Sequence, residues 1–96
     1  MNKIKFNNAE FEVESYNKTT SFTGETMSST AYCTIITDDI ETLNEVAQTE
    51  ITTIQISHDD EVIYSLENQH GHIDSTNEYL NGDRMSVSAN LSFTYE

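Results

Sequence analysis

The sequence predicts a mainly β domain, either a β-sandwich or a partly open barrel of about six or seven strands with one short α-helix. Two patterns carry this prediction. From Met85 to Tyr95, six apolar residues occupy every second position, as in a strand with one buried face. Between Asp38 and Gln48, apolar residues instead recur at the spacing of a helix. The length of 96 residues suits a single domain, residues 1–96, with one modest core.

The first predicted element is a hairpin from Ile4 to Tyr16. Asn7 and Asn8 both tolerate the left-handed backbone conformation that a tight turn requires. After this turn, Phe11 and Val13 alternate with glutamates, which is typical of a half-buried strand with an acidic solvent face.

An exposed loop, a central strand and the helix are predicted next. Residues 19–30 are rich in Ser and Thr around Gly24, so we expect them to form a loop. Residues 31–37 are apolar on both faces, which suits a strand in the middle of a sheet. Asp38 is placed to cap the helix, with Glu41 three residues on, as in a capping box. A helix of roughly ten residues is unstable alone and must pack on the sheet.

Two more hairpins are predicted in the C-terminal half. The first hairpin turns at residues 58–60. The strand before the turn carries Ile51, Ile54 and Ile56, and the strand after it carries Val62, Tyr64 and Leu66. The second ends in the strand that begins at Met85. A two-residue turn at Asn81-Gly82 would place Glu78 opposite Met85 and leave the apolar face unmatched. A three-residue loop places Tyr79 opposite Met85 and Ile73 opposite Leu91, and we predict this register.

Charge is the most pronounced feature of the composition. Seventeen acidic residues against four basic ones give a net charge of −13, and no lysine or arginine lies between Lys18 and Arg84. Nucleic acids and anionic membranes both select cationic surfaces, so we expect neither as a direct partner. No apolar run approaches the roughly 20 residues that span a bilayer, and the first residues do not resemble a signal peptide, so we expect a protein that is not secreted.

The candidate reactive residues are few. Cys33 is the one cysteine, which fits a reducing compartment; it is either a nucleophile or, as we expect, a buried structural thiol. His70 and His72 would share one face of a strand and could chelate a metal with Asp74 or His58, but this spacing is common, and solvated or partner-facing histidines are expected instead.

Catalytic and cofactor-binding patterns are not recognised either. The acids of residues 59–61 adjoin one another, whereas a calcium loop alternates its ligands, so we expect a solvated turn. The sequence has no nucleophile elbow and no glycine-rich phosphate loop. We therefore predict a protein that is not an enzyme, with no catalytic residues, metal ligands or cofactor.

The order of the predicted elements resembles that of small β-sandwich proteins from the tails and baseplates of tailed bacteriophages. The stretches that carry most of the resemblance are Ile51–Ser57, Val62–Asn68 and Met85–Tyr95. Proteins of this kind are non-enzymatic and often form rings. The resemblance implies a structural virion component, assembled in the bacterial cytoplasm, that binds copies of itself or other virion proteins. Under this hypothesis Phe22, Tyr79 and Leu80 are candidate contacts.

A compact, very acidic chain also suits a second class, a phage-encoded inhibitor that mimics nucleic acid and blocks a host defence nucleoprotein. Its contact residues would be two acidic pairs, Asp38 with Asp39 and Asp59 with Asp60. The two hypotheses differ in how the carboxylates are distributed. A mimic needs them on one face, whereas an assembly subunit spreads them or directs them at a lumen.

Overall fold

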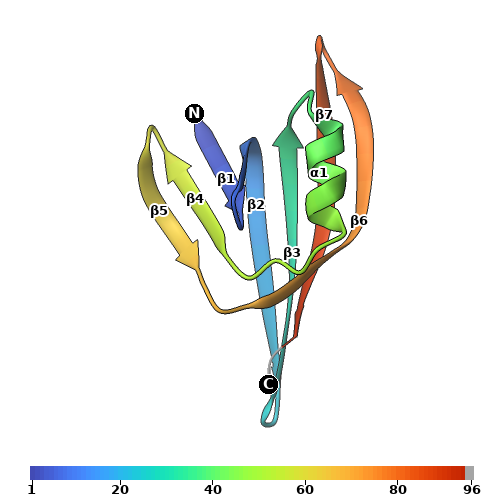
Figure 1. The fold of residues 1–96 in the computed structure, drawn as a ribbon. Coiled ribbons are helices and arrows are strands. Elements are labelled where there is room, and N and C mark those ends of the chain that lie inside the picture. Colours follow the sequence, from blue (N-terminus) through green and yellow to red (C-terminus); the bar gives the residue numbers. More distant parts are fainter. Residues whose placement is uncertain (95–96) are drawn as a thin grey trace.

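The computed structural model describes residues 1–94, which form one seven-stranded antiparallel sheet and one helix (Figure 1). In chain order the elements are β1 (Asn2–Phe6), β2 (Ala9–Thr23), β3 (Thr26–Ile36), α1 (Ile40–Ala47), β4 (Ile54–His58), β5 (Glu61–Leu66), β6 (His70–Asn81) and β7 (Arg84–Thr94). Their order across the sheet is β5-β4-β1-β2-β3-β7-β6, so the sheet is not closed into a barrel. The predicted mainly β fold with one short helix is confirmed. Tyr95, the last residue of the predicted C-terminal strand, lies outside the described residues.

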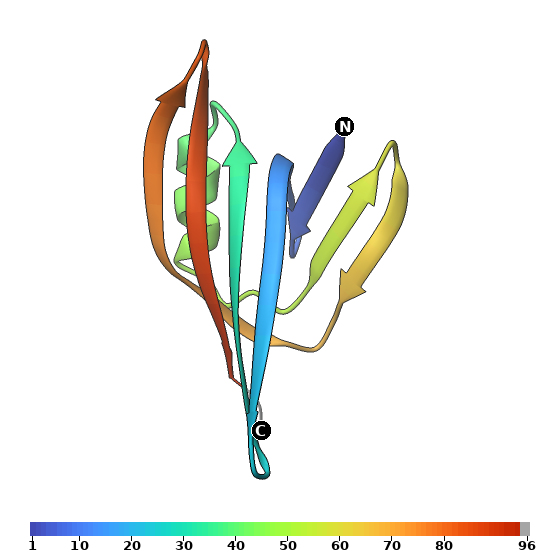
Figure 2. The same cartoon turned by 180° about the vertical axis from the view of Figure 1, so that it is seen from behind.

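The sheet bends at β2. Residues 9–12 of this strand pair with β1, whereas residues from Glu12 onward pair with β3. A β-bulge at Glu14 separates the paired residues Val13 and Ser15. Because a bulge adds one unpaired residue, it bends the strand and moves the following side chains to the other face. Figures 1 and 2 show the resulting sharp bend, which brings β4 and β5 round to face the part of β2 that directly follows the bulge.

The core fills the concave face of the sheet, which we define as the face that carries the buried alternating side chains and α1. Every strand except β5 contributes fully buried or nearly buried apolar residues. Leu43, 1% exposed, is the buried residue of α1, and Ile40, Val46 and Ala47 pack against the core at its margin. Among residues 1–94, no helix is long and apolar enough to cross a membrane.

A short backbone contact ties the two ends of the sheet together. The N–H of Ile51 donates to the carbonyl of Gly71 at 2.7 Å, and the N–H of Gly71 donates back at 3.0 Å. The N–H of Gln69 donates to the carbonyl of Thr52 at 3.2 Å. The segment before β4 is therefore fastened to the beginning of β6, although the edge strands β5 and β6 do not pair.

The prediction of a loop at residues 19–30 is wrong. These residues form the ends of β2 and β3, and only Gly24 and Glu25 connect the strands. Threonine favours extended structure, and hydroxyls bond across the hairpin, as between Thr20 Oγ1 and Ser29 Oγ at 2.7 Å. Most of this hairpin is exposed on both faces, so the alternation that reveals other strands is missing from its sequence.

The helix is predicted correctly, but its cap is displaced by one residue. Asp39 is the N-cap, and its carboxylate accepts from the Thr42 N–H at 3.2 Å and the Thr42 Oγ1 at 2.7 Å. The Asp39 N–H donates to Thr37 Oγ1 at 3.0 Å. Asp38 is exposed and precedes the cap, so its predicted capping role is wrong.

The predicted register of the last hairpin is partly wrong. A two-residue loop, Gly82-Asp83, places Tyr79 opposite Ser86 instead of Met85. The predicted pairing of Ile73 with Leu91 is confirmed, because a bulge between Ile73 and Ser75 absorbs one residue. The two other predicted turns are confirmed, with left-handed conformations at Asn7, Asp59 and Asp60.

Candidate assembly surfaces

Two hairpin tips carry the most exposed large apolar side chains of the described chain. Phe22, in the β2–β3 hairpin, is 73% exposed, and Leu80, in the β6–β7 hairpin, is 71% exposed. The two hairpins extend beyond the core at opposite ends of the molecule, below and above it in Figure 1. Since the molecule measures 46 × 28 × 20 Å, these tips mark the ends of its long axis.

Each tip presents a pair of apolar residues on the same face of the sheet. Phe22 lies opposite Met27, and Leu80 lies opposite Met85. We call the first pair the lower tip and the second the upper tip. Side chains two residues apart along a strand share a face. Met27 therefore lies on the face of buried Ala31, and Met85 lies on the face of buried Val87 and Ala89. The apolar concave face therefore ends in an apolar pair at each tip, in which Phe22, Met27 and Leu80 are exposed and Met85 is half-buried.

Tyr79 lies on the opposite, convex face of the upper hairpin. It is 37% exposed, about half as much as Leu80. This convex face is polar, and its other large aromatic residue, Tyr32, donates a hydrogen bond from its hydroxyl to Ser88 Oγ at 2.9 Å. The sequence prediction named Phe22, Tyr79 and Leu80, but it missed Met27, because residues 19–30 were expected to be a loop without cross-strand neighbours.

The four predicted acidic contacts are all exposed but lie on two separate loops. Asp38 and Asp39 precede α1, and Asp59 and Asp60 form the β4–β5 turn. Figures 1 and 2 place both loops at the end of the molecule that carries the upper tip, on different arms of the sheet. The structure thus brings the two pairs to one end without joining them into one cluster.

Asp59 already has partners within the chain. Its Oδ1 accepts a hydrogen bond from the N-terminal ammonium of Met1 at 3.0 Å, and its Oδ2 lies 3.3 Å from His58 Nε2. The hydrogen bond from the N-terminus, followed by the charge of His58, lowers the pKa of the Asp59 carboxyl. Asp39 is similarly engaged as the helix cap. One acid of each pair therefore has a local structural role.

The histidines are distributed over two sites. His70 Nδ1 lies 2.8 Å from Glu50 Oε1, beside the contact between Ile51 and Gly71. His58 lies at the end of β4, where its Nδ1 is 2.6 Å from Asn2 Oδ1. Within residues 1–94, no group of three or more His, Cys, Asp or Glu side chains is arranged to hold a metal ion. Cys33 is fully buried, as predicted, and burial raises the pKa of its thiol to about 12.

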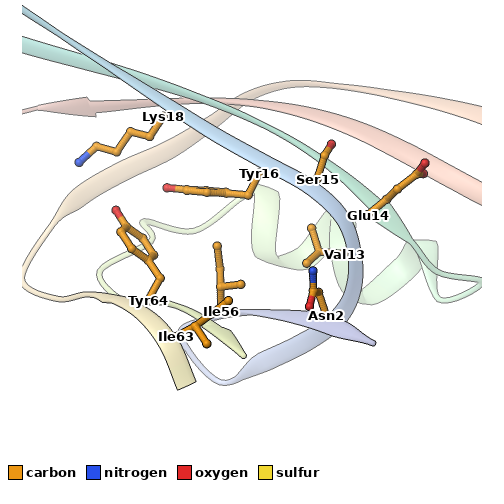
Figure 3. A pocket seen from close by; sticks show the side chains of 9 residues that line it. All are labelled: Asn2, Val13, Glu14, Ser15, Tyr16, Lys18, Ile56, Ile63 and Tyr64. Atoms are coloured by element: carbon orange, nitrogen blue, oxygen red, sulfur yellow. The ribbon is translucent and has the colours of Figure 1, made fainter. Parts of the chain in front are cut away.

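A cleft of about 630 Å³ lies between β2, after its bulge, and the β4–β5 hairpin (Figure 3). Its residues are Asn2, Val13, Glu14, Ser15, Tyr16, Lys18, Ile56, Ile63 and Tyr64. The rings of Tyr16 and Tyr64 meet across it with centroids 5.7 Å apart. Lys18 lies at one end, and its Nζ is 5.2 Å from the centre of the Phe93 ring. The only sequence signal for this cleft is the break in alternation after Val13, where Ser15 stands in place of an apolar residue.

Comparison with protein-family models, curated protein sequences and solved structures gave no significant match.

Proposed function

We propose that this protein acts by protein–protein assembly, as a structural component of a phage tail or baseplate within the virion. The observation that supports the proposal is the pair of apolar tips at opposite ends of the long axis. Exposed large apolar residues gathered at a protruding point are typical of contact sites. Two different sites on one chain favour a heterologous contact, in which the lower tip of one copy binds the upper tip of the next. Such contacts generate rings when they close and filaments when they do not.

The first test is the molar mass in solution, measured by light scattering after size exclusion over a range of concentrations. We expect a defined oligomer, or growth into longer particles. Phe22→Ser and Leu80→Ser should each reduce this mass toward the monomer. Neither should change the free energy of unfolding by more than about 0.5 kcal/mol, because both side chains are exposed. Val62→Ser is the matched control, since Val62 is 53% exposed on β5, away from both tips.

Mixing the two variants tests the heterologous geometry. Phe22→Ser keeps an intact upper tip, and Leu80→Ser keeps an intact lower tip. The mixture should therefore form one intact contact and stop at twice the monomer mass, while each variant alone stays monomeric. A contact between identical tips gives no such rescue and would refute the head-to-tail arrangement.

The acidic end supports a second candidate function, inhibition of a basic nucleic-acid-binding protein by mimicry. The two exposed acidic pairs lie at the same end of the molecule, on different arms of the sheet. A monomer at every concentration would favour this candidate. Reversal of the four charges, Asp38, Asp39, Asp59 and Asp60 to Lys, should then abolish binding to the basic target, whereas it should leave assembly through the tips intact.

A further inference from the structure

The β2–β3 hairpin is electrically neutral within a strongly acidic chain. From Ser15 to Thr37 the sequence has one acidic residue, Glu25, and one basic residue, Lys18. The whole net charge of −13 therefore resides in the other segments. Two copies of such a chain repel each other where acidic surfaces meet. A second copy meets no net repulsion from this hairpin itself, which carries the lower tip.

The Lys18 ammonium lies on the concave face of this hairpin, close to the lower tip. Side chains two residues apart along a strand share a face, so Lys18, Thr20 and Phe22 lie in one line. Thr20 and Phe93 both pair with Ser29, so they stand in one row across the sheet. Lys18 Nζ is 5.2 Å from the centre of the Phe93 ring. The ammonium therefore lies near the row of Thr20, which is two residues, or roughly 7 Å, from Phe22.

The β6–β7 hairpin carries a carboxylate at a matching distance from the upper tip. Asp83 is exposed in the two-residue loop of this hairpin. It follows Met85 by two positions toward the end of the molecule, which along a strand is roughly 7 Å. The cation of the hairpin, Arg84, alternates with Met85 and lies on the convex face, where its Nη1 donates to Glu12 Oε2 at 3.0 Å. Arg84 is thus engaged within its own chain, and the loop presents a negative group.

The two hairpins point in opposite directions along the long axis (Figure 1). When the upper tip of one copy overlaps the lower tip of the next, the β6–β7 loop therefore extends toward the body of that next copy. Leu80 then rests against Phe22. Asp83, roughly 7 Å further on, reaches the row of Thr20, near which the Lys18 ammonium lies.

We propose that the concave faces of the two hairpins meet in this register, with Leu80 of one copy against Phe22 of the next and an ion pair between Asp83 and Lys18. The partner is a second copy of this chain, selected by the complementary charges beside the apolar tips. The inference rests on the proposed function and assigns the residues that align its contact.

The same register brings two carboxylates together at the other end of the contact. Glu78 pairs with Val87 and so lies on the concave face, two residues before Leu80. Glu25 lies in the loop of the β2–β3 hairpin, beyond Phe22. Like charges that face each other across an interface oppose binding. Removal of either carboxylate should therefore strengthen the contact, whereas loss of the ion pair should weaken it.

A mixture of Phe22→Ser and Leu80→Ser chains isolates one contact. The Leu80→Ser chain supplies the lower tip, and the Phe22→Ser chain supplies the upper tip. Sedimentation equilibrium measures the dissociation constant of this dimer. We expect Lys18→Glu in the Leu80→Ser chain, or Asp83→Lys in the Phe22→Ser chain, to raise that constant by about 2- to 10-fold. Both reversals together should restore it, because the ion pair is re-formed with its charges exchanged.

The matched control is the same substitution in the other chain. Lys18→Glu in the Phe22→Ser chain changes the net charge equally, but it lies on the unused hairpin and should leave the dissociation constant unchanged. Two neutral substitutions test the opposed carboxylates. Glu25→Gln in the Leu80→Ser chain and Glu78→Gln in the Phe22→Ser chain should each lower the constant, by about 2-fold.

Each outcome bears on a separate part of the inference. Equal weakening by Lys18→Glu in either chain, or no recovery when both reversals are combined, would overturn the ion pair. Weaker binding after Glu25→Gln would overturn the register. Asp83→Lys changes an exposed loop, so it tests the pair even if Lys18→Glu destabilises the hairpin by losing the contact with Phe93. A mixture that forms no dimer refutes the proposed head-to-tail contact and this inference together, whereas a dimer insensitive to every charge change refutes the register alone.

Discussion

The substitution Gly71→Ala tests the close contact of Gly71 with Phe93 and the backbone of Ile51. A Cβ atom at this position would lie 2.9 Å from Phe93 Cε1, 3.0 Å from Phe93 Cδ1 and 3.2 Å from the carbonyl oxygen of Ile51. The Phe93 ring has little room to move because it is 5% exposed, and the Ile51 oxygen is fixed by the backbone bonds with Gly71 itself. Alanine therefore requires the strand ends to separate or the core to shift.

The size of the effect follows from two opposing terms. Overpacking of a well-filled core costs about 1–3 kcal/mol. Replacing glycine by alanine also restricts the unfolded chain, which returns about 0.4–1 kcal/mol. We expect a net loss of about 1–2 kcal/mol, which lowers the melting temperature by about 4–16 °C at roughly 4–8 °C per kcal/mol for a domain of this size.

Urea unfolding followed by circular dichroism measures this loss, and a double-mutant cycle identifies its source. Phe93→Leu shortens the side chain that alanine would strike, so Gly71→Ala should cost less in that background than in the native chain. Thr76→Ala, an exposed change on the same strand, is the control and should stay within about 0.5 kcal/mol. An unchanged or raised stability of Gly71→Ala, or the same cost in both backgrounds, would show that the contact is not crowded.

Two further predictions concern Asp39 and Cys33. Asp39→Ala should lower the free energy of unfolding by about 0.5–2 kcal/mol through loss of the helix cap. Asp38→Ala should have almost no effect in the same urea titration. A larger loss from Asp38→Ala than from Asp39→Ala would show that Asp38 is the cap instead. For Cys33, burial keeps the thiol protonated in the folded state up to a pKa of about 12, whereas in the unfolded chain it ionises near its ordinary pKa of 9.0. The folded state then holds more protons above pH 9, so stability should fall as pH rises from 9 to 12. Cys33→Ala should show a smaller fall in stability over this pH range. In the native protein, Cys33 should react with a thiol reagent at pH 8 only as fast as the protein unfolds. Rapid labelling would contradict the burial of this thiol.

The elements with one buried face could be predicted from the sequence. The alternation in β7 and the asparagine turn of the first hairpin both depend on local rules, and the structure follows them. The bulge at Glu14 was not predicted, because its one local signal, the break in alternation after Val13, equally fits the end of a strand. Its effect reaches well beyond β2, since it bends the sheet and places Tyr16 in the cleft.

The candidate surfaces were predictable only in part for the same reason. Phe22 and Leu80 could be chosen from the sequence as exposed apolar residues. Their positions at opposite ends of the molecule, however, depend on two hairpins that extend beyond the core. Polar cross-strand pairs join the ends of β2 and β3 within residues 19–30. Because these residues are mostly exposed on both faces, their sequence lacks the alternation of apolar and polar residues that predicts a strand. The distribution of charge likewise depends on which loops lie close together in the fold. The two acidic pairs could therefore be identified from the sequence, but their positions relative to each other could not be predicted.

The order of strands also determines how the chain must fold. Four of the six pairings join neighbours in sequence, but the β1–β4 and β3–β7 pairings do not, and Ile36 of β3 pairs with Ser86 of β7. These two seams divide the sheet into three units: β4–β5, β1–β2–β3 and β6–β7. Each unit can form locally, yet the core between them is completed only when distant segments meet, and the entropy of closing those long loops must be overcome first. Such non-local topologies fold in about milliseconds to seconds. During that interval the inner edges of β3 and β7 are open to other chains, so the docking of the three units is the step at which misassembly competes with folding.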